Sequence, residues 1–360
     1  MGEGTWVAGC MSGTSLDGVD VALVRTDGVE IFETGDSAFR PYSAAEQALL
    51  RRALGRWDCP DEVTELIETA HAEALAQVDG YDLIGFHGQT LAHAPHERRT
   101  HQAGSGEVLA QITGRPVVWD FRTADVELGG QGAPLAPFYH HALARHAGLS
   151  APVAFLNLGG VGNLTWADPR QPDPAHPAAL LAFDTGPANA PINDLMAARR
   201  GAPRDDGGAL AAQGAPDMTI VSQFLGLPYF SKMPPKSLDR NDFSGLGDAV
   251  ADLSDADAAA TLTAFSAACV ALAMSHCPTP PTALYACGGG RHNPTLMAMI
   301  AAGIDCPLAP VEDLGFDGDM LEAQAFAYLA ARVRAGLPTS CPTTTGVAAA
   351  IGGGRLSRPD

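Results

Sequence analysis

The chain has 360 residues, of which 46% are hydrophobic and only 6% aromatic, with frequent glycine and proline. This length suggests two domains, and the mixture is typical of an α/β protein rich in small aliphatic residues and glycine turns. The formal net charge of −19 argues against a nucleic acid or an anionic membrane as a partner. A site for anionic substrates therefore needs backbone N–H groups, a few cations or a metal ion.

The cysteines and the apolar segments indicate the compartment. Seven cysteines are scattered without a Cys-x-x-Cys pair, which is typical of reduced thiols rather than of a disulfide framework. The sequence opens without a basic and apolar leader, and no apolar run reaches transmembrane length. We therefore expect a soluble, cytoplasmic protein.

The first half of the chain alternates between predicted strands and helices. Short apolar runs bounded by turn residues predict strands, and apolar residues at helical spacing predict helices. Ser43 followed by Glu46 is typical of a helix start. The expected elements, in chain order, are strands at 6–9, 19–24 and 31–33, helices at 43–54 and 61–78, strands at 82–86 and 116–120, and a helix at 135–146.

A second cycle of the same kind begins at Pro152. Its expected elements are strands at 153–158, 164–166 and 179–183, helices at 190–200 and 256–276, a strand at 283–287, and helices at 294–302 and 320–334. Both halves open with a strand, a polar glycine-rich turn and a second strand, and no short repeat period is present. We therefore expect an N-terminal lobe of residues 1–150 and a C-terminal lobe of residues 151–360, with a nucleotide in the cleft between them.

Residues 9–20, GCMSGTSLDGVD, lie between the first two predicted strands and hold more polar groups than a turn needs. Three glycines permit close approach of a ligand to the backbone, and three hydroxyl side chains add donors for phosphate oxygens. Asp17 and Asp20 suit a sugar hydroxyl or Mg²⁺ bound through water. The sequence predicts a phosphate-binding turn; the alternative is a polar turn that binds nothing.

Two further glycine-rich segments lie in the second half. Residues 159–163, GGVGN, form the turn that corresponds to the first one. Residues 287–293, CGGGRHN, follow a predicted strand and precede a helix, so their backbone could approach an adenine, a ribose, or a phosphate at the helix N-terminus. This segment lacks the Gly-Lys-Ser/Thr ending of a P-loop.

Asp184 follows a predicted strand and stands beside Gly186-Pro187. Ligands of α/β sheets bind at the carboxyl ends of the strands, so this carboxylate is placed to accept a proton from an attacking hydroxyl or water. The alternative is an aspartate that caps the following helix.

Polar residues also gather after the predicted strands of the first half. Arg122 could bind a carboxylate through two hydrogen bonds, and Gln131 could contact sugar hydroxyls; the alternative is a surface loop in which Asp125 pairs with arginine. His87 and the three histidines that follow it form no His-Glu-x-x-His motif, and no cysteine cluster accompanies them. We therefore expect a structural or substrate-contacting His87 rather than a zinc site.

Taken together, these segments resemble the anhydro-N-acetylmuramic acid kinase family. The matching segments, which span nearly the whole chain in order, are 11–20 (MSGTSLDGVD), 87–90 (HGQT), 120–122 (DFR), 129–135 (GGQGAPL), 157–160 (NLGG), 183–187 (FDTGP), 234–237 (PPKS), 287–290 (CGGG) with Asn293, and 322–327 (EAQAFA). The resemblance implies a two-lobed actin/hexokinase/Hsp70-like ATPase fold, which is a duplicated ribonuclease H-like α/β fold with nucleotide in the interlobe cleft.

The resemblance also implies a reaction. Such a kinase uses ATP and Mg²⁺ to open the 1,6-anhydro ring of 1,6-anhydro-N-acetylmuramic acid hydrolytically and to phosphorylate O6. The product is N-acetylmuramic acid 6-phosphate, an intermediate of peptidoglycan recycling. Asp184 would be the base that activates water for attack on the anomeric carbon. Because dimers are common among such kinases, the resemblance allows a homodimer.

The resemblance assigns further residues to the ligands. Asp17 would bind Mg²⁺ through water. The residues expected to bind the nucleotide are Gly13, Thr14, Ser15, Leu16, Asp17, Gly18, Val19, Asp20, Asn157, Gly159, Gly160, Gly288, Gly289, Gly290 and Asn293. The residues expected to contact the sugar are Gln89, Asp120, Arg122 and Glu322.

This chain departs from the family pattern in three places. Ala188 stands where the family tends to have glycine, and 238–241 (LDRN) replace Thr-Gly-Arg-Glu. An aspartate that is usual shortly after the catalytic motif is replaced by Asn193, with Asp194 next to it. We expect these changes to affect turnover and lobe closure more than identity, because Asp184 and the first turn are intact. They motivate two alternatives: a kinase of the same fold for another amino sugar, and a non-catalytic, nucleotide-gated binding protein.

Overall fold

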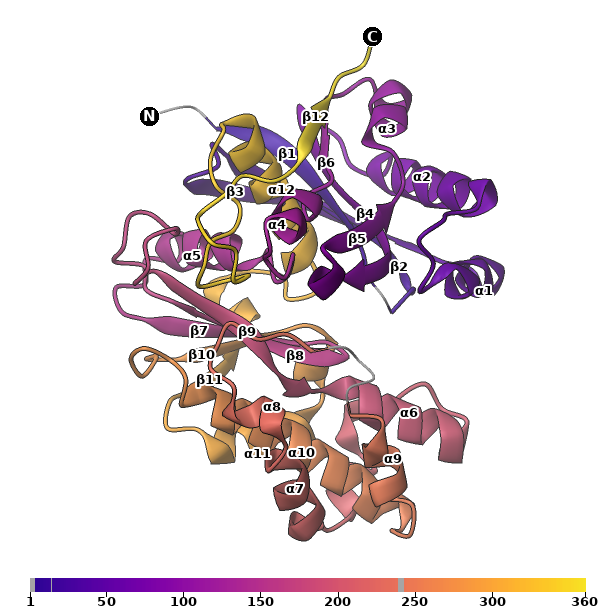
Figure 1. Ribbon diagram of the computed structural model, residues 1–360, viewed down its shortest axis with the longest axis vertical. Coiled ribbons are helices and arrows are strands. Elements are labelled where there is room, and N and C mark those ends of the chain that lie inside the picture. Colours follow the sequence, from indigo (N-terminus) through magenta and orange to yellow (C-terminus); the bar gives the residue numbers. More distant parts are fainter. Residues whose placement is uncertain (1–3, 14, 239–242) are drawn as a thin grey trace. The chain divides into compact units, whose positions relative to one another are not determined.

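The computed structural model describes residues 4–13, 15–238 and 243–360. The chain forms two compact units (Figure 1). Unit 1 comprises Met1–Ser150, Gln171–Leu180 and Met320–Asp360, and unit 2 comprises Ala151–Arg170 and Leu181–Asp319. The first boundary between the units therefore falls where the sequence suggested it.

The C-terminal segment belongs to unit 1, which differs from the expected C-terminal lobe of residues 151–360. Helix α12 (Leu321–Arg334) packs against strands β1, β2 and β4 of unit 1. Strand β12 (Arg355–Ser357) pairs with β6 of the same sheet. The end of the chain thus completes the first hydrophobic core rather than the second.

Unit 1 contains a seven-stranded mixed sheet in the order β12-β6-β4-β1-β2-β3, with β5 paired to β4. The strands besides β12 are β1 (Thr5–Ser12), β2 (Gly18–Thr26), β3 (Ile31–Pro41), β4 (Leu83–Ala94), β5 (Arg99–Ala103) and β6 (Val117–Trp119). The expected hairpin of β1 and β2 is antiparallel, whereas β4 runs parallel to both β1 and β6. The first glycine-rich turn joins the two strands of this hairpin.

Helices of unit 1 cover this sheet. Besides α12 they are α1 (Ala44–Ala53), α2 (Asp61–Leu75), α3 (Gly106–Thr113), α4 (Thr123–Glu127) and α5 (Pro137–His146). The predicted start of α1 is confirmed by a capping box, in which the Ser43 hydroxyl accepts from the Glu46 N–H and the Glu46 carboxylate accepts from the Ser43 N–H.

Unit 2 contains a five-stranded sheet in the order β11-β10-β7-β8-β9. Its strands are β7 (Val153–Leu158), β8 (Val161–Ala167), β9 (Leu180–Pro187), β10 (Leu284–Cys287) and β11 (Leu308–Pro310). In both units the first strand lies between an antiparallel second strand and a parallel later strand, and a further parallel strand follows outside. This repeated order confirms the duplicated ribonuclease H-like plan of actin-like ATPases.

Helices make up much of the rest of unit 2. They are α6 (Asn189–Arg200), α7 (Met218–Leu225), α8 (Pro228–Ser231), α9 (Gly245–Ala249), α10 (Asp255–Met274) and α11 (Pro294–Gly303). By length and composition alone, α10 could cross a membrane. Most of it is buried against α6, α7, α11 and β8, as expected for a core helix that is apolar on all sides.

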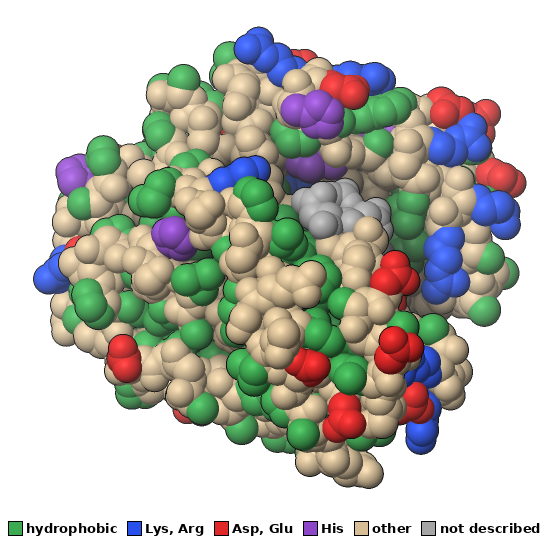
Figure 2. Space-filling model, turned by 60° about the horizontal axis from the view of Figure 1, so that its bottom comes forward, with side chains coloured by type: hydrophobic (Ala, Val, Ile, Leu, Met, Phe, Trp, Pro, Cys, Tyr) green, Lys and Arg blue, Asp and Glu red, His purple; other side chains and the backbone are tan. Residues whose placement is uncertain are grey.

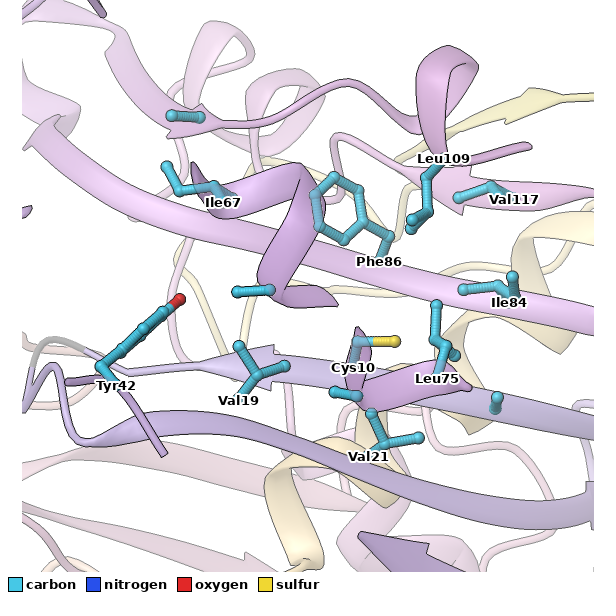
Figure 3. Packing of buried hydrophobic residues seen from close by; sticks show 14 of the residues in the cluster. Cys10, Val19, Val21, Tyr42, Ile67, Leu75, Ile84, Phe86, Leu109 and Val117 are labelled. Atoms are coloured by element: carbon cyan, nitrogen blue, oxygen red, sulfur yellow. The ribbon is translucent and has the colours of Figure 1, made fainter. Parts of the chain in front are cut away.

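Each unit has its own hydrophobic core. In unit 1, Val21 from β2, Phe86 from β4 and Ile67 from α2 belong to one cluster of buried side chains (Figure 3). In unit 2, one cluster involves the sheet, and a second lies among the helices. The second cluster is rich in aromatic rings, with Phe230 of α8 packed edge-on against Phe265 of α10. This packing fixes the short helix α8 in unit 2.

Many basic side chains are neutralised by carboxylates within their own unit. Arg40 of β3 pairs with Glu46 and Glu73, and Arg291 of unit 2 is likewise bonded to two carboxylates. On the face drawn in Figure 2, acidic and basic side chains are interspersed. Exposed pairs add little stability, but they leave fewer cations for an anionic ligand. A buried cation without a carboxylate partner is therefore informative in this chain.

Two glycines allow α12 to approach the sheet of unit 1. A Cβ on Gly9 would lie 1.8 Å from the Ala323 carbonyl oxygen, and one on Gly85 would lie 2.2 Å from that of Phe326. We expect Gly9→Ala and Gly85→Ala each to destabilise the fold by about 2–3 kcal/mol, because the helix must move away. Thermal unfolding measures the change. Gly247→Ala in α9, where a Cβ meets no atom within 4 Å, is the control, and equal unfolding temperatures for all variants would contradict this packing.

Candidate functional site

Asp184 lies near the end of β9 and does not cap a helix, because the N-cap residue of α6 is Ala188. Its N–H donates to the Lys236 carbonyl (3.0 Å), and its own carbonyl accepts from the Tyr229 hydroxyl (2.5 Å). Its Oδ2 accepts from the Leu238 N–H (2.8 Å). One segment of unit 2 therefore holds Asp184 at three points, while Oδ1 accepts no hydrogen bond from the described residues.

The environment of Asp184 favours proton exchange at neutral pH. Burial raises the pKa of this carboxyl group to about 7, and the hydrogen bond from the Leu238 N–H opposes the shift. A carboxylate with a pKa near the working pH is suited to act as a general base. Tyr229 and Lys236 were not predicted to be neighbours of Asp184, although Lys236 lies in the segment 234–237 (PPKS), which resembles the family.

The departures at Ala188 and Asn193 lie shortly after Asp184 in the sequence, whereas Leu238 is 54 residues away and contacts Asp184 in the fold. Leu238 bonds Asp184 through its backbone, so a change of side chain at this position keeps the hydrogen bond. The Ala188 methyl group is packed in the hydrophobic core, and the residue is 2% exposed. The remaining departures, Asp239, Arg240 and Asn241, lie outside the described residues.

The second glycine-rich turn is attached to the start of α6. The Asn189 side-chain amide donates to the carbonyls of Leu158 and Gly159, both at 2.9 Å. Backbone N–H groups of 188–190 donate to the carbonyls of Gly159 and Gly160. The turn and Asp184 are therefore held in one rigid arrangement, because β9 leads directly into α6.

Two of the three glycines after β10 pack against the end of β7, next to this second turn. A Cβ on Gly288 would lie 2.2 Å from Asn157 Oδ1, and one on Gly290 would lie 2.5 Å from Leu158 Cβ. A Cβ on Gly289 would meet no atom within 4 Å. The structure thus brings Asn157 and the glycines together in unit 2, with open space at Gly289.

Asn293 is the N-cap of α11, where its Oδ1 accepts from the Leu296 N–H (3.0 Å). Because Oδ1 is used in this cap, the side-chain Nδ2 of Asn293 is the group left for the predicted contact with a nucleotide. Beside the start of α11 lies an open hollow of about 540 Å³. The hollow is lined by Ala211, Ala212, Gly214, Pro294, Thr295, Ala298, Met299 and Ala302. Its surface is mostly apolar and belongs entirely to unit 2.

The first glycine-rich turn lies in unit 1. Leu16 has a positive φ of 57°, and its side chain is buried. The Ser15 hydroxyl donates to Asp17 Oδ1 (2.6 Å), and both side chains are exposed. Residues 18–20 begin β2, whereas Thr14 lies outside the described residues. The turn therefore presents a hydroxyl and a carboxylate at its surface.

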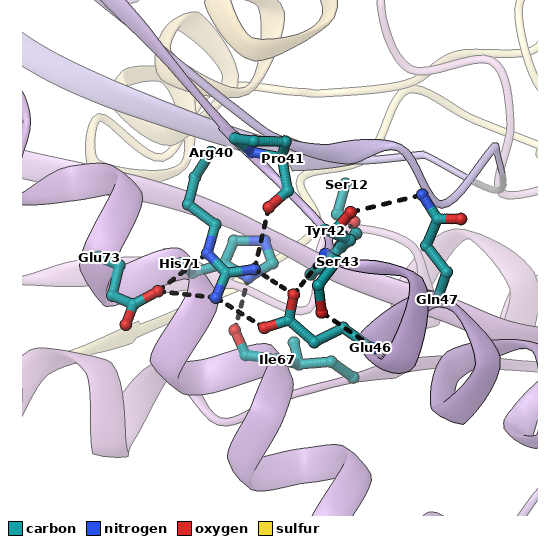
Figure 4. A network of polar contacts seen from close by, with 10 residues as sticks. All are labelled: Ser12, Arg40, Pro41, Tyr42, Ser43, Glu46, Gln47, Ile67, His71 and Glu73. Atoms are coloured by element: carbon teal, nitrogen blue, oxygen red, sulfur yellow. Dashed lines mark hydrogen bonds and ion pairs between the residues drawn. The ribbon is translucent and has the colours of Figure 1, made fainter.

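Gln89 holds the first turn from within the core. Its Oε1 accepts from the Ser12 hydroxyl (2.6 Å), and its Nε2 donates to the Gly13 carbonyl (3.2 Å). The Tyr42 hydroxyl lies 3.2 Å from the same Ser12 oxygen, next to the ion pairs of Arg40 (Figure 4). Gln89 is completely buried, so its amide positions the turn, and the predicted contact with a sugar gains no support.

Arg122 lies at the start of α4. Its Nε donates to His87 Nε2 (2.9 Å), and its Nη1 donates to the Gly132 carbonyl (2.6 Å). His87 therefore carries its proton on Nδ1, which donates to the Gly88 carbonyl (2.8 Å). Burial, together with the Arg122 charge, keeps the pKa of His87 well below its usual value, and burial lowers the pKa of Arg122 to about 10.

Three guanidinium hydrogens of Arg122 make no hydrogen bond to the described residues, since its five donors serve only two acceptors. The charge of Glu322 acts on the guanidinium and favours its charged form. Asp120 has a positive φ of 59°; its carboxylate accepts from the Thr123 hydroxyl and pairs with Arg355 (2.9 Å). Arg122 thus has donors left, whereas both Asp120 oxygens have partners.

Asp125 is buried, which corrects its interpretation as a surface residue paired with arginine. Its Oδ1 accepts from the Gly132 N–H (2.7 Å). Its Oδ2 accepts from the hydroxyls of Ser340 (2.5 Å) and Thr345 (2.6 Å). The C-terminal segment thereby fixes the glycine loop beside Arg122, through contacts that no local sequence pattern could reveal.

Comparisons with known proteins identify the family of this chain. The family model described as anhydro-N-acetylmuramic acid kinase matches residues 5–356. The anhydro-N-acetylmuramic acid kinase of Cereibacter sphaeroides is 64% identical over 362 residues, covering 100% of this chain and 98% of the relative. That of a Ruegeria species is 58% identical over 354 residues, covering 98% and 94%.

Solved structures of other kinases are similar to this chain at low identity. A ROK family glucokinase from Streptomyces griseus, in complex with glucose and AMPPNP, is 15% identical with a TM-score of 0.42, covering 90% of this chain and 99% of its own. A ligand-bound xylulose kinase from Lactobacillus acidophilus is 12% identical with a TM-score of 0.43, covering 99% and 94%.

The raised pKa of Asp184 predicts a pH-dependent stability. The folded protein keeps this proton up to about pH 7, whereas the unfolded chain releases it near the ordinary value of 3.8, so folding loses stability as the pH rises between these values. Asp184→Asn keeps an acceptor for the Leu238 N–H without the charge. We expect its unfolding temperature to match the parent at about pH 4 and to exceed it at about pH 8.

Thermal unfolding across this pH range tests the expectation. Asp252→Asn, at an exposed position of unit 2, is the matched control and should follow the parent at every pH. A variant at position 184 that is less stable than the parent at high pH would show that the protein stabilises the Asp184 anion instead.

Proposed function

Because this chain belongs to the anhydro-N-acetylmuramic acid kinase family, we propose that Asp184 is the general base with which it opens the 1,6-anhydro ring of 1,6-anhydro-N-acetylmuramic acid. The ring opening accompanies phosphorylation of O6 by ATP. One observation carries the proposal: a carboxyl group with a pKa of about 7 lies in the second half of strand β9, is held at three points, and has Oδ1 left over for water. The 44–64% identity to curated kinases over nearly their full length supports the activity.

The chemistry consumes one water and one ATP for each sugar. Asp184 takes a proton from water as the water oxygen bonds to the anomeric carbon. The bond between that carbon and O6 breaks, and its electron pair stays on O6. O6 then bonds to the γ-phosphorus of ATP, the bond from that phosphorus to the bridging oxygen breaks, and ADP leaves. The products are N-acetylmuramic acid 6-phosphate, ADP and the proton that Asp184 accepted.

We propose that both glycine-rich turns and the glycines at 288–290 bind the nucleotide. The first turn offers backbone and hydroxyl donors to phosphate oxygens, and the open space at Gly289 admits a ligand against the backbone. The apolar hollow beside α11 suits the flat face of a nucleotide base. A nucleotide-binding cleft between the two lobes was expected from the sequence, and it stays a prediction.

A divalent cation fits the chemistry of the first turn. Asp17 has an exposed carboxylate, only one oxygen of which accepts from Ser15, so it offers the hard oxygen ligand that Mg²⁺ prefers, directly or through water. When bound, Mg²⁺ would neutralise charge on the ATP phosphates. Asp17 itself would orient that ion without taking part in proton transfer.

On the sugar side, we propose that Arg122 binds the lactyl carboxylate that distinguishes muramic acid from glucosamine. Its Nε is already used by His87, so the usual side-on pairing through Nε and Nη is blocked. The remaining hydrogens on Nη1 and Nη2 leave an end-on pair of donors. Glu322, whose charge acts on the same guanidinium, and Asp120 are proposed to contact sugar hydroxyls.

The compartment and assembly are part of the same proposal. All seven cysteines are free thiols in the structure, which supports the reducing cytoplasm where ATP is available. A homodimer is expected from the resemblance to the family.

Asp184→Asn should abolish turnover, because the amide cannot take a proton from water, and it should leave nucleotide binding nearly unchanged. ADP release with Mg-ATP and 1,6-anhydro-N-acetylmuramic acid measures turnover, and titration calorimetry measures binding. In the parent, kcat/KM should fall below about pH 7, since the base must be ionised. Near-normal turnover by the variant would remove Asp184 from the mechanism, and Asp252→Asn is the control.

The choice of sugars in this assay separates the alternatives. Turnover with N-acetylglucosamine or N-acetylmuramic acid, but not with the anhydro sugar, would indicate a kinase of the same fold with another substrate. Nucleotide binding without turnover of any sugar would indicate the non-catalytic binding protein.

Arg122→Met should reduce the preference for the carboxylated sugar. We expect kcat/KM for 1,6-anhydro-N-acetylmuramic acid to fall about tenfold to a hundredfold relative to that for 1,6-anhydro-N-acetylglucosamine, which lacks the lactyl group. The ratio for the two sugars is the readout, because a folding defect lowers both values equally. Arg115→Met, at an exposed position of unit 1, should keep the parent ratio. An unchanged ratio in Arg122→Met would exclude this contact.

A further inference from the structure

The distribution of lysine in the chain is unusual. Of 22 basic residues, only Lys232 and Lys236 are lysines, and the other 20 are arginines. The two lysines lie four positions apart, in the segment that holds Asp184. Lys232 is exposed, whereas Lys236 is 9% exposed. In a chain that uses arginine almost everywhere else, a buried lysine suggests a site that needs a compact ammonium group.

The surroundings of Lys236 explain why an ammonium group fits there. Its Nζ donates to the Tyr229 carbonyl (3.3 Å) and lies 4.7 Å from the centroid of the Tyr229 ring and 5.8 Å from that of Phe183. None of the described carboxylates forms an ion pair with it. Two aromatic rings and a carbonyl therefore stabilise the cation, an arrangement that a larger planar guanidinium would disturb.

The same residues hold Asp184. The Lys236 carbonyl accepts from the Asp184 N–H, and the Tyr229 hydroxyl donates to the Asp184 carbonyl. Phe183, which faces the ammonium, is the residue immediately before Asp184 in β9. The Lys236 side chain thus contacts the residue before Asp184 and the residue that bonds the Asp184 carbonyl.

We propose that Lys236 is a positioning residue for Asp184: its ammonium holds Tyr229 against the end of β9 and so keeps the carboxylate oriented toward the reacting water. This inference rests on the proposed function of Asp184 and adds the group that orients it. The hydroxyl of Tyr229 is the direct contact, and Lys236 acts through it.

Other charged and titratable groups face Lys236. Cys269 from α10 and Lys232 act on its charge, and His276, which follows α10, is in turn influenced by Lys236. Burial lowers the pKa of Lys236, and burial raises that of Cys269, so the thiol stays neutral beside the ammonium.

The test compares the two lysines. Lys236→Met keeps much of the side-chain volume and removes the charge, and Lys232→Met makes the same change four residues away at an exposed position. We expect kcat of Lys236→Met to fall about tenfold to a hundredfold, with KM for the sugar and for ATP within about twofold of the parent. Lys232→Met should match the parent.

Tyr229→Phe provides a second variant that keeps the ring and removes only the hydroxyl that bonds the Asp184 carbonyl. It should lower kcat with little change in KM, and the double variant with Lys236→Met should lose less than the product of the two effects, because both act through one contact. If Lys236→Met does not fold, Tyr229→Phe decides the question by the same comparison of kcat with KM.

The outcomes separate this inference from the proposed function. Parent-like kcat values for Lys236→Met and for Tyr229→Phe, with Asp184→Asn inactive, would overturn the positioning role alone. A kcat loss in Lys232→Met equal to that in Lys236→Met would also overturn it. Full activity of Asp184→Asn would instead overturn the assignment of the base.

Discussion

The burial of one carboxylate is the constraint on which the candidate site of unit 2 depends. Asp184 must be kept away from bulk water to have a pKa near 7, and it must also be held in place when it becomes an anion. The structure meets both needs with backbone hydrogen bonds, because the Leu238 N–H and the Lys236 carbonyl are bonded to it directly. Backbone partners are neutral, so they orient the carboxylate without the full charge that would lower its pKa further.

In unit 1, close packing of α12 against the β1–β2 hairpin holds the first glycine-rich turn in place. The hairpin of β1 and β2 rests on α12, which comes from the far end of the sequence and approaches within contact of Gly9. Gln89 and Ser12 then fix the base of the turn by hydrogen bonds, so the exposed groups of the turn project from a rigid support. In both units the polar groups that we propose to face a ligand are held by hydrogen bonds from groups packed directly behind them.

The sequence predicted most of the fold, because its signals are local. The two hairpins, the capped helix after Ser43 and the long apolar helix α10 all follow from periodicity and turn residues. The residues 320–360 were assigned to the wrong part of the fold, since their place depends on the fit of α12 against Gly9 and Gly85, which no local pattern encodes. Strand β3 extends beyond its prediction through mostly exposed residues, which lack apolar alternation. Strand β4 extends beyond its prediction through residues that are mostly buried but include the polar His87, Gln89 and Thr90, so no apolar run marks them.

The candidate site was only partly predictable, for a related reason. Asp184 was identified because a carboxylate after a strand has a local signature. Gln89, by contrast, was expected at the sugar although its amide is used inside the protein, and Asp125 was expected at the surface although two distant hydroxyls bind it. Residue type indicates which contacts a side chain can make, but the fold decides which of them it makes.

Each unit holds a buried or half-buried cation that forms no ion pair with a described carboxylate, and this is uncommon in so acidic a chain. With a net charge of −19, a cation in this chain tends to find a carboxylate, and Arg40 shows the common outcome. Arg122 and Lys236 differ, since their hydrogen bonds among the described residues go to carbonyls and an imidazole rather than to carboxylates. A cation held by neutral partners keeps most of its field for a negative charge that binds later, which for Arg122 is, as we propose, the carboxylate of the substrate.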